Sequence, residues 1–176
     1  MTHDIAIGLG TPLQEAEEIK HSDGIALSDM TDENEMIAVP SVGGRNNRQM
    51  KKMVLAGIIE DRFREIFELI GREIEKTHYH KLMASGVVIT GGSCIMPGVD
   101  QLAHQVLNMP VRVGFPEHIS GLKELIYSPK YATSVGLVRY GITSNQGKLN
   151  FVGDETNLFH KVSRRMKAVS YTHLTL

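Results

Sequence analysis

The sequence predicts an α/β fold, and two features carry that prediction. A short apolar run, GVVIT at 86–90, ends at two adjacent glycines, and a helical pattern over about 97–107 and a second apolar run at 111–113 follow it. Strand, turn, helix and strand in this order form a βαβ unit, which implies a parallel sheet with helices packed on it. The second feature is a long stretch, 54–76, in which apolar side chains recur at helical spacing.

The first half of the chain predicts helices and one edge strand. Apolar residues at helical spacing within 13–19 predict a helical region from Asp4 to Lys20, with Pro12 in a first turn. A polar, acidic loop at 29–35 leads to an expected edge strand at 36–39, which ends at Pro40. The segment SVGGR at 41–45 has the composition of a turn.

The long helix and the βαβ unit complete the expected core. The apolar stripe of the helix is formed by Ile58, Ile59, Phe63, Ile66, Phe67, Ile70 and Ile74. Because 86–90 is continuously apolar, we expect that strand to be buried on both faces. A last helix is expected over about 130–142, and the chain loses periodicity after Thr143.

Composition excludes several classes of protein. The 176 residues are 41% hydrophobic and 22% charged, and 19 basic against 20 acidic side chains leave a net charge of −1. No overall field therefore attracts the chain to nucleic acid or to an anionic membrane. A single cysteine, Cys94, rules out an internal disulfide. The N-terminus lacks the pattern of a signal peptide, and no apolar run approaches the ~20 residues that span a bilayer, so we expect a soluble, cytoplasmic chain.

The glycine turn is the candidate binding site. TGGSCIMPG at 90–98 lies where a buried strand passes into a helix, and ligands of open parallel sheets bind at the carboxyl ends of strands. Two residues without Cβ let the backbone approach a ligand closely, and Ile95 and Met96 offer an apolar face to a purine ring. A plain tight turn explains the two glycines equally well, so the residues alone leave both interpretations open.

Several segments resemble one family. VITGGSCIMPG resembles the adenosine motif of the actin, DnaK-chaperone and sugar-kinase superfamily, and VPSVGGR at 39–45, residues 57–62 and ATSVGLVRYG at 132–141 resemble the bacterial FtsA family. The resemblance covers about 1–145 and implies a partial actin-like (ribonuclease H-like) ATPase fold with second-half subdomains only. It assigns 1–22 and 86–145 to a larger subdomain, 23–85 to an inserted smaller one, and 146–176 to a linker and a tail expected to be non-native.

The resemblance implies an ATP site on its adenosine side. It places Gly91, Gly92 and Ser93 against the adenosine, with Ile95 and Met96 beside the base. AEEIK at 16–20 resembles the helix whose acid and base, here Glu17 and Lys20, approach the adenine and ribose. A solvated i, i+3 ion pair is the alternative for these two residues. The family's phosphate loops have no counterpart in this chain, so we expect no catalytic residue, no metal ligand, and Mg only in the full-length parent.

The implied function is that of an ATP-binding adaptor in cell division rather than an enzyme. In the FtsA family, the region here spanning 23–85 docks the tail of the tubulin-like protein FtsZ. Arg45, Arg48, Lys51 and Lys52 form a basic strip suited to that acidic-hydrophobic peptide, although plain solubility explains each of them equally well. Nucleic acid is not expected, because the strip lacks aromatic residues.

The resemblance also implies properties of the full-length protein. These are self-association into actin-like filaments, contacts with other divisome proteins, and attachment to the inner face of the cell membrane at the division site through a C-terminal amphipathic helix. Here the chain ends instead in a basic segment, KVSRRMK at 161–167, and in VSYTHLTL, which resembles translated sequencing-adaptor read-through. A sugar or acetate kinase, a DnaK-type chaperone and a protein-binding scaffold without nucleotide remain the alternatives.

Overall fold

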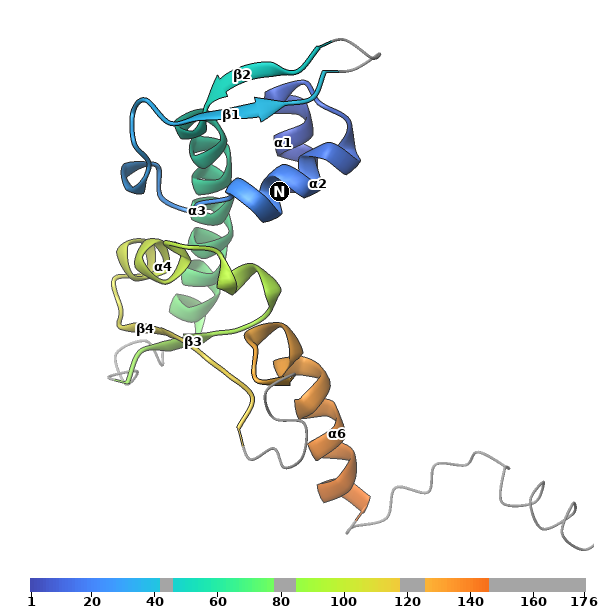
Figure 1. Cartoon of the computed structure of the whole chain (residues 1–176). Coiled ribbons are helices and arrows are strands. Elements are labelled where there is room, and N and C mark those ends of the chain that lie inside the picture. The colour runs from blue at the N-terminus through green and yellow to red at the C-terminus, as the bar shows by residue number, and fades with distance from the viewer. Residues whose placement is uncertain (42–45, 78–84, 118–125, 146–176) are drawn as a thin grey trace, which may run out of the picture. The chain divides into compact units, whose positions relative to one another are not determined.

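The computed structural model describes residues 1–41, 46–77, 85–117 and 126–145. Contacts divide the chain into a unit from Met1 to Gly136 and a unit from Leu137 to Leu176. Of the second unit, only the end of one helix is described. Among the described helices, none is both long and apolar enough to cross a membrane. Figure 1 shows the order of the elements.

Two helices occupy the region where one was predicted. Helix α1 spans Thr2–Leu9 and α2 spans Leu13–Asp23. Gly10 ends α1 in the left-handed conformation with φ of 59°, which favours glycine, and its amide donates to the carbonyl of Ile7. Pro12 then precedes the first residue of α2. The predicted helical region is therefore confirmed except for a break at residues 10–12, because the left-handed Gly10 ends α1 before Pro12.

The expected edge strand is confirmed and has an antiparallel partner. Strand β1, Met36–Val39, pairs with β2, Arg48–Lys51, and a short 3-10 helix, η1 (Ser28–Met30), precedes them. Ile37 and Val39 alternate with exposed residues and enter the core. The turn predicted at 41–45 lies largely outside the described residues.

The long helix is confirmed, and its apolar stripe divides into two parts. Helix α3 spans Lys52–Lys76 and buries Leu55, Ala56, Ile59, Phe63 and Phe67. The described residues bury Ile59, Phe63 and Phe67 of the predicted stripe, whereas Ile66 and Ile70 are each 39% exposed. The rings of Phe63 and Phe67 stack with their centroids 5.8 Å apart, and this part of α3 packs against α4.

The βαβ unit is present as predicted. Strand β3 (Val87–Ile89) leads through a 3-10 turn, η3 (Gly92–Ile95), to α4 (Val99–Leu107) and then to β4 (Val111–Val113), which pairs in parallel with β3. Val87 and Ile89 pack on the core, whereas Val88 is 51% exposed. The expectation that this strand is buried on both faces is thus wrong for the described residues, since they cover only one face.

The last described helix begins at a second 3-10 turn. This turn, η4, spans Pro129–Tyr131, and α6 follows it over Ala132–Asn145. The helix predicted at about 130–142 is confirmed.

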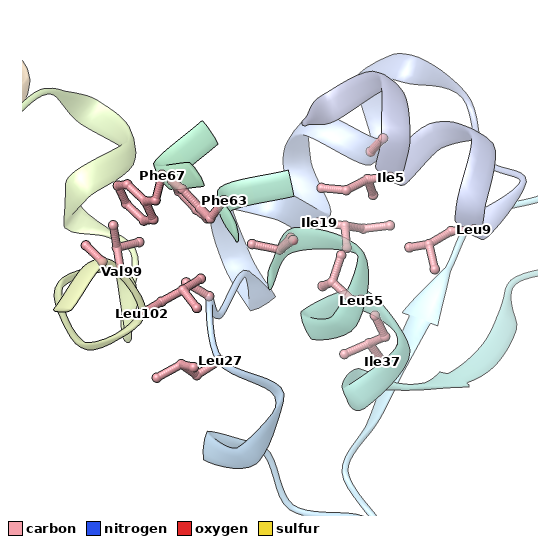
Figure 2. Close-up of a cluster of buried hydrophobic side chains, with 14 of the residues drawn as sticks. Ile5, Leu9, Ile19, Leu27, Ile37, Leu55, Phe63, Phe67, Val99 and Leu102 are labelled. Carbon is pink, nitrogen blue, oxygen red and sulfur yellow. The ribbon is translucent and has the colours of Figure 1, made fainter. Parts of the chain in front are cut away.

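One hydrophobic cluster joins distant parts of the chain. Figure 2 shows side chains from α1, α2, β1, α3 and α4 in this cluster, among them Ile5, Ile19, Leu55, Phe67 and Val99. The cluster therefore contains residues from each of the expected segments 1–22, 23–85 and 86–145. The subdomain boundaries at 22 and 85 stay a prediction.

A salt bridge fixes α1 against α3. The guanidinium of Arg62 donates to both carboxylate oxygens of Asp4, at 2.7 Å and 2.6 Å. The Asp4 carboxylate is 27% exposed, and the hydrogen bonds from Arg62 hold the pKa of Asp4 well below its usual value. The charged carboxylate therefore stabilises the fold.

We predict that Asp4→Asn lowers the free energy of unfolding at pH 7 by about 1 kcal/mol, because a partly exposed pair is screened by solvent. Since the pKa of Asp4 is lowered in the folded state, this stability is present above the ordinary carboxyl pKa and is lost as pH falls below it. Urea unfolding from pH 7 to pH 3 measures the difference, which should shrink toward acid. Glu75→Gln, at an exposed position of α3, is the control, and a difference independent of pH would contradict the assignment.

Candidate functional site

The two glycines of the turn have different geometries. Gly91 has φ of 111°, a conformation that side chains rarely allow, and its amide donates to the carbonyl of Pro129 at 3.1 Å. Gly92 lies outside that region, and a Cβ placed on it would meet only Cβ of Lys130, at 3.7 Å. A Cβ on Gly91 would meet no atom within 4 Å. The backbone at both positions thus borders open space.

A pocket of about 440 Å³ lies in front of this turn. Five of the seven residues predicted for the adenosine side line it: Gly92, Ser93, Ile95, Met96 and Lys20. Ile95 is 53% exposed, so an apolar side chain is available to a ligand. Gly91 and Glu17 do not line the pocket directly but adjoin residues that do. The structure therefore brings Lys20 and the segment 92–96 to one pocket, and their contact with adenosine stays a prediction.

A backbone contact brings the two segments together. The amide of Ala26, just after α2, donates to the carbonyl of Pro97 at 2.9 Å, and Ala26 is fully buried. Gly24 lies so close to Met96 that a Cβ on Gly24 would approach the methionine methyl group to 2.9 Å. The end of α2 is therefore fixed against the residues that follow the glycine turn.

Glu17 holds Lys20 at the edge of the pocket. The Lys20 ammonium donates to Glu17 at 2.6 Å and to the hydroxyl of Thr2 at 3.1 Å, and the Thr2 hydroxyl donates to the second oxygen of Glu17 at 2.5 Å. These contacts, with the ammonium of Lys20 first, lower the pKa of Glu17 to about 2. Glu17 is therefore ionised at neutral pH and positions the ammonium of Lys20, whose side chain is 18% exposed.

The i, i+3 ion pair that was the alternative interpretation for Glu17 and Lys20 is present in the structure. The pair exists, and in addition it lies beside the pocket. His21 adds a third contact, because its Nε2 lies 3.1 Å from Glu17 and its ring lines the pocket. Whether these side chains contact a ligand stays a prediction.

Lys130 is a lining residue that the sequence analysis missed. Turn η4 is fastened to the glycine turn, because the carbonyl of Pro129 accepts from the amide of Gly91 and from the hydroxyl of Thr90, the latter at 3.3 Å. The ammonium of Lys130 lies 4.8 Å from the centroid of the Tyr131 ring. No local pattern signals this placement, since 38 positions separate Gly92 from Lys130 and only the fold joins them.

Cys94 has a structural place in the turn. Its thiol contacts the carbonyl of Thr90 at 3.3 Å, and burial raises the pKa of the Cys94 thiol. A raised thiol pKa lowers the thiolate fraction at neutral pH, so the geometry does not favour a nucleophile. Among the described residues, no group of three His, Cys, Asp or Glu side chains could hold a metal ion.

The predicted basic strip is largely engaged within the protein. Arg48 donates to the carbonyl of Leu9 at the end of α1, and Lys52 pairs with Glu35 at 2.8 Å. Arg45 lies outside the described residues. Lys51 is exposed, and none of the described carboxylates pairs with it. Of the three residues that the structure describes, Lys51 is the one whose charge is left available to a partner.

Comparison with known proteins agrees with the resemblance. The family model described as cell division protein FtsA matches residues 1–136. The chain is 42% identical to cell division protein FtsA of Pseudomonas aeruginosa over 142 residues, which are 81% of this chain and 34% of that protein. It is 39% identical to the Escherichia coli K12 protein of that name, over 82% of this chain and 36% of that protein. The chain thus spans about a third of the length of these relatives.

Solved structures support the fold. The crystal structure of MreB5 of Spiroplasma citri bound to AMPPNP superposes with a TM-score of 0.60 at 14% identity, over 82% of this chain and 43% of that chain. The same protein bound to ADP gives a TM-score of 0.57 at 13% identity, over 82% and 44%. The fold is therefore a partial actin-like fold, as predicted. With the family model matched over residues 1–136, the chain belongs to the FtsA family of cell division proteins.

Proposed function

We propose that the chain supplies the adenosine side of an ATP site in a full-length FtsA protein, an actin-like adaptor that links the FtsZ ring to the membrane. The observation that carries this proposal is the pocket in front of Gly91 and Gly92. Two distant segments, 20–24 and 92–97, close on this pocket and are fastened by the Ala26 to Pro97 hydrogen bond.

The lining suits a nucleoside. Ile95 and Met96 provide apolar surface for a purine ring, while Ser93 and the ammonium of Lys20 provide polar contacts for a ribose. The two structures that share the fold contain AMPPNP and ADP, so this fold holds adenine nucleotides in those proteins. The family membership excludes the kinase and chaperone alternatives, and it leaves the nucleotide-free scaffold as the rival that experiment must separate.

The proposal assigns the phosphates to the remainder of the full-length protein. The basic side chains among the described lining residues are Lys20, His21 and Lys130, and none of these lining residues is a carboxylate, the side chain through which proteins usually bind Mg. We propose that the other half of the actin-like fold supplies the phosphate loops and Mg. The segment alone then acts as a binding element and not as a catalyst.

We predict that Gly92→Leu lowers the affinity of the full-length protein for ATP at least tenfold. The backbone accepts a side chain at this position, because a Cβ on Gly92 meets only Lys130 at ordinary contact distance and Gly92 has no left-handed φ. The leucine then occupies the space that the purine nucleoside needs. Calorimetric titration with ATP measures the change, and circular dichroism checks that the fold is kept.

Gly57→Leu is the matched control, since a Cβ on Gly57 in α3 meets no atom within 4 Å. It should leave ATP affinity unchanged. Equal ATP affinity in Gly92→Leu and the unmodified protein would contradict the pocket assignment. Absence of ATP binding in the unmodified protein would favour the scaffold.

We also propose that the β1–β2 hairpin docks the acidic-hydrophobic tail of FtsZ. Lys51 lies opposite Met36 in the register of the hairpin, and Met36 is 49% exposed. Met53 and Val54, at the start of α3, are 36% and 44% exposed. A cation beside exposed apolar side chains matches a peptide that carries both acidic and apolar residues.

We predict that Lys51→Glu weakens binding of a fluorescent FtsZ tail peptide several-fold in an anisotropy titration, because it replaces an attraction with a repulsion. Arg48 and Lys52 are poorer test positions, since their charges contact Leu9 and Glu35 within the fold. Arg72→Glu, which reverses an exposed charge on α3, is the control. Equal affinity in both variants would remove the hairpin from the docking surface.

Other properties are proposed for the full-length protein. They are self-association into actin-like filaments, contacts with other divisome proteins, and a peripheral position on the inner face of the membrane at the division site. Their place in the proposal derives from family membership alone.

A further inference from the structure

A hydroxyl from a neighbouring helix completes the contacts of Lys20. Thr2, the first residue of α1, donates to one carboxylate oxygen of Glu17 at 2.5 Å and accepts from the ammonium of Lys20 at 3.1 Å. The ammonium donates to the other oxygen of Glu17 at 2.6 Å. Thr2, Glu17 and Lys20 therefore form a closed ring of three hydrogen bonds between α1 and α2.

The ion pair within α2 is too weak to fix the ammonium by itself. The side chain of Glu17 is 44% exposed, and an ion pair that solvent reaches contributes little. Lysine also carries its ammonium on a flexible four-carbon stem. The hydroxyl of Thr2 supplies a contact from outside α2, so the ammonium has acceptors on two different helices.

The backbone that carries Thr2 is itself held in place. Ile5, about one turn further along α1, is fully buried in the hydrophobic cluster. Asp4 is bound by the guanidinium of Arg62 on α3. The hydroxyl of Thr2 therefore projects from a helix that the core and a salt bridge both fix.

The ring of hydrogen bonds leaves the ammonium able to bind a ligand. A lysine ammonium has three donors, and in the part of the chain that the structure describes two of them go to Thr2 and Glu17. Lys20 lines the pocket, whereas Thr2 and Glu17 contact Lys20 without lining it. The third donor is thus available to an acceptor in the pocket, while the other two fix the position of the ammonium.

We propose that Thr2 is a positioning residue of the nucleotide site, whose hydroxyl holds the Lys20 ammonium in place for a polar group of the nucleoside. This inference rests on the proposed function and deepens it, because it assigns a role to a side chain that does not line the pocket. Its physical basis is preorganisation, since a cation that is already fixed loses less freedom when the ligand binds.

The test is calorimetric titration of the full-length protein with ATP. We expect Thr2→Val, which keeps the branched shape but removes the hydroxyl, to weaken ATP binding about fivefold, the net contribution of one hydrogen bond. Thr2→Ser keeps the hydroxyl and should retain ATP affinity. Thr31→Val is the matched control, because it removes a hydroxyl that bonds to the carbonyl of Ser28 at 2.6 Å, and it should leave ATP affinity unchanged.

A second background separates positioning from a merely structural role. If Thr2 acts through the ammonium, Thr2→Val should change ATP affinity little in a Lys20→Met protein, because the group that it positions is gone. An equal loss of affinity with and without the ammonium would mean that Thr2 only supports the fold, and the proposal would be refuted. Equal loss in Thr2→Ser and Thr2→Val would refute it as well, since the serine keeps the hydroxyl.

The outcomes also separate this inference from the proposed site. If Gly92→Leu weakens ATP binding but Thr2→Val or Lys20→Met does not, the role of Thr2 is refuted and the site stands. If Gly92→Leu leaves ATP affinity unchanged, the site falls and this inference falls with it.

Discussion

Helix α3 contacts both halves of the first unit, since it packs against α1, η1 and β2 at one end and against α4 further along. Helix α3 has 25 residues, which correspond to about 37 Å of length. Its first turns bury Leu55 and Ile59 against α1, α2 and β1, and its middle buries Phe63 and Phe67 against α4. One helix makes both contacts. The first group consists of α1, α2 and the hairpin, and the second is the βαβ unit. These two groups therefore cannot move apart without exposing apolar surface that α3 now buries.

Polar contacts from α3 fix the orientation of the elements packed against it. The Arg62 guanidinium fixes α1, and Glu60 accepts from both the amide and the hydroxyl of Ser28, at 2.8 Å and 2.7 Å. Burial alone would raise the pKa of Glu60, but the bonds from Ser28 and Arg64 outweigh it and the pKa is lowered. The loop after α2 is thereby held to α3, and the Ala26 to Pro97 bond then has a defined position. The pocket is a consequence of these contacts.

Local patterns predicted most of the fold because they reflect local causes. The βαβ unit, the edge strand and the long helix each depend on spacing within one segment. The prediction failed where the backbone conformation of a single residue, or packing by a distant segment, determines the local structure. Gly10 splits the first helical region through its left-handed φ, and Val88 is exposed because the described elements lie on one face only.

The candidate site shows the same division. The glycine turn was found from its own residues, whereas Lys130 enters the pocket only through the hydrogen bonds of Pro129. The partners of charged side chains are even harder to predict from local sequence. Arg48 and Lys52 lie in a basic segment, yet Arg48 bonds to a carbonyl of α1 and Lys52 pairs with Glu35. The prediction from neighbouring basic residues therefore overestimated the free positive surface. The sequence alone does not show which acceptor groups the fold brings to each basic side chain.

The geometry of the turn also separates two reasons for the paired glycines that the residues alone could not distinguish. At Gly91 the left-handed φ suffices as an explanation, because any side chain there strains the backbone whether or not a ligand exists. At Gly92 neither φ nor a neighbouring atom requires glycine, since a Cβ would be at ordinary contact distance from Lys130. The plain-turn interpretation therefore accounts for the first glycine and leaves the second unexplained. The ligand that we propose at this pocket would give a reason for the second glycine, and position 92 is where the two interpretations differ.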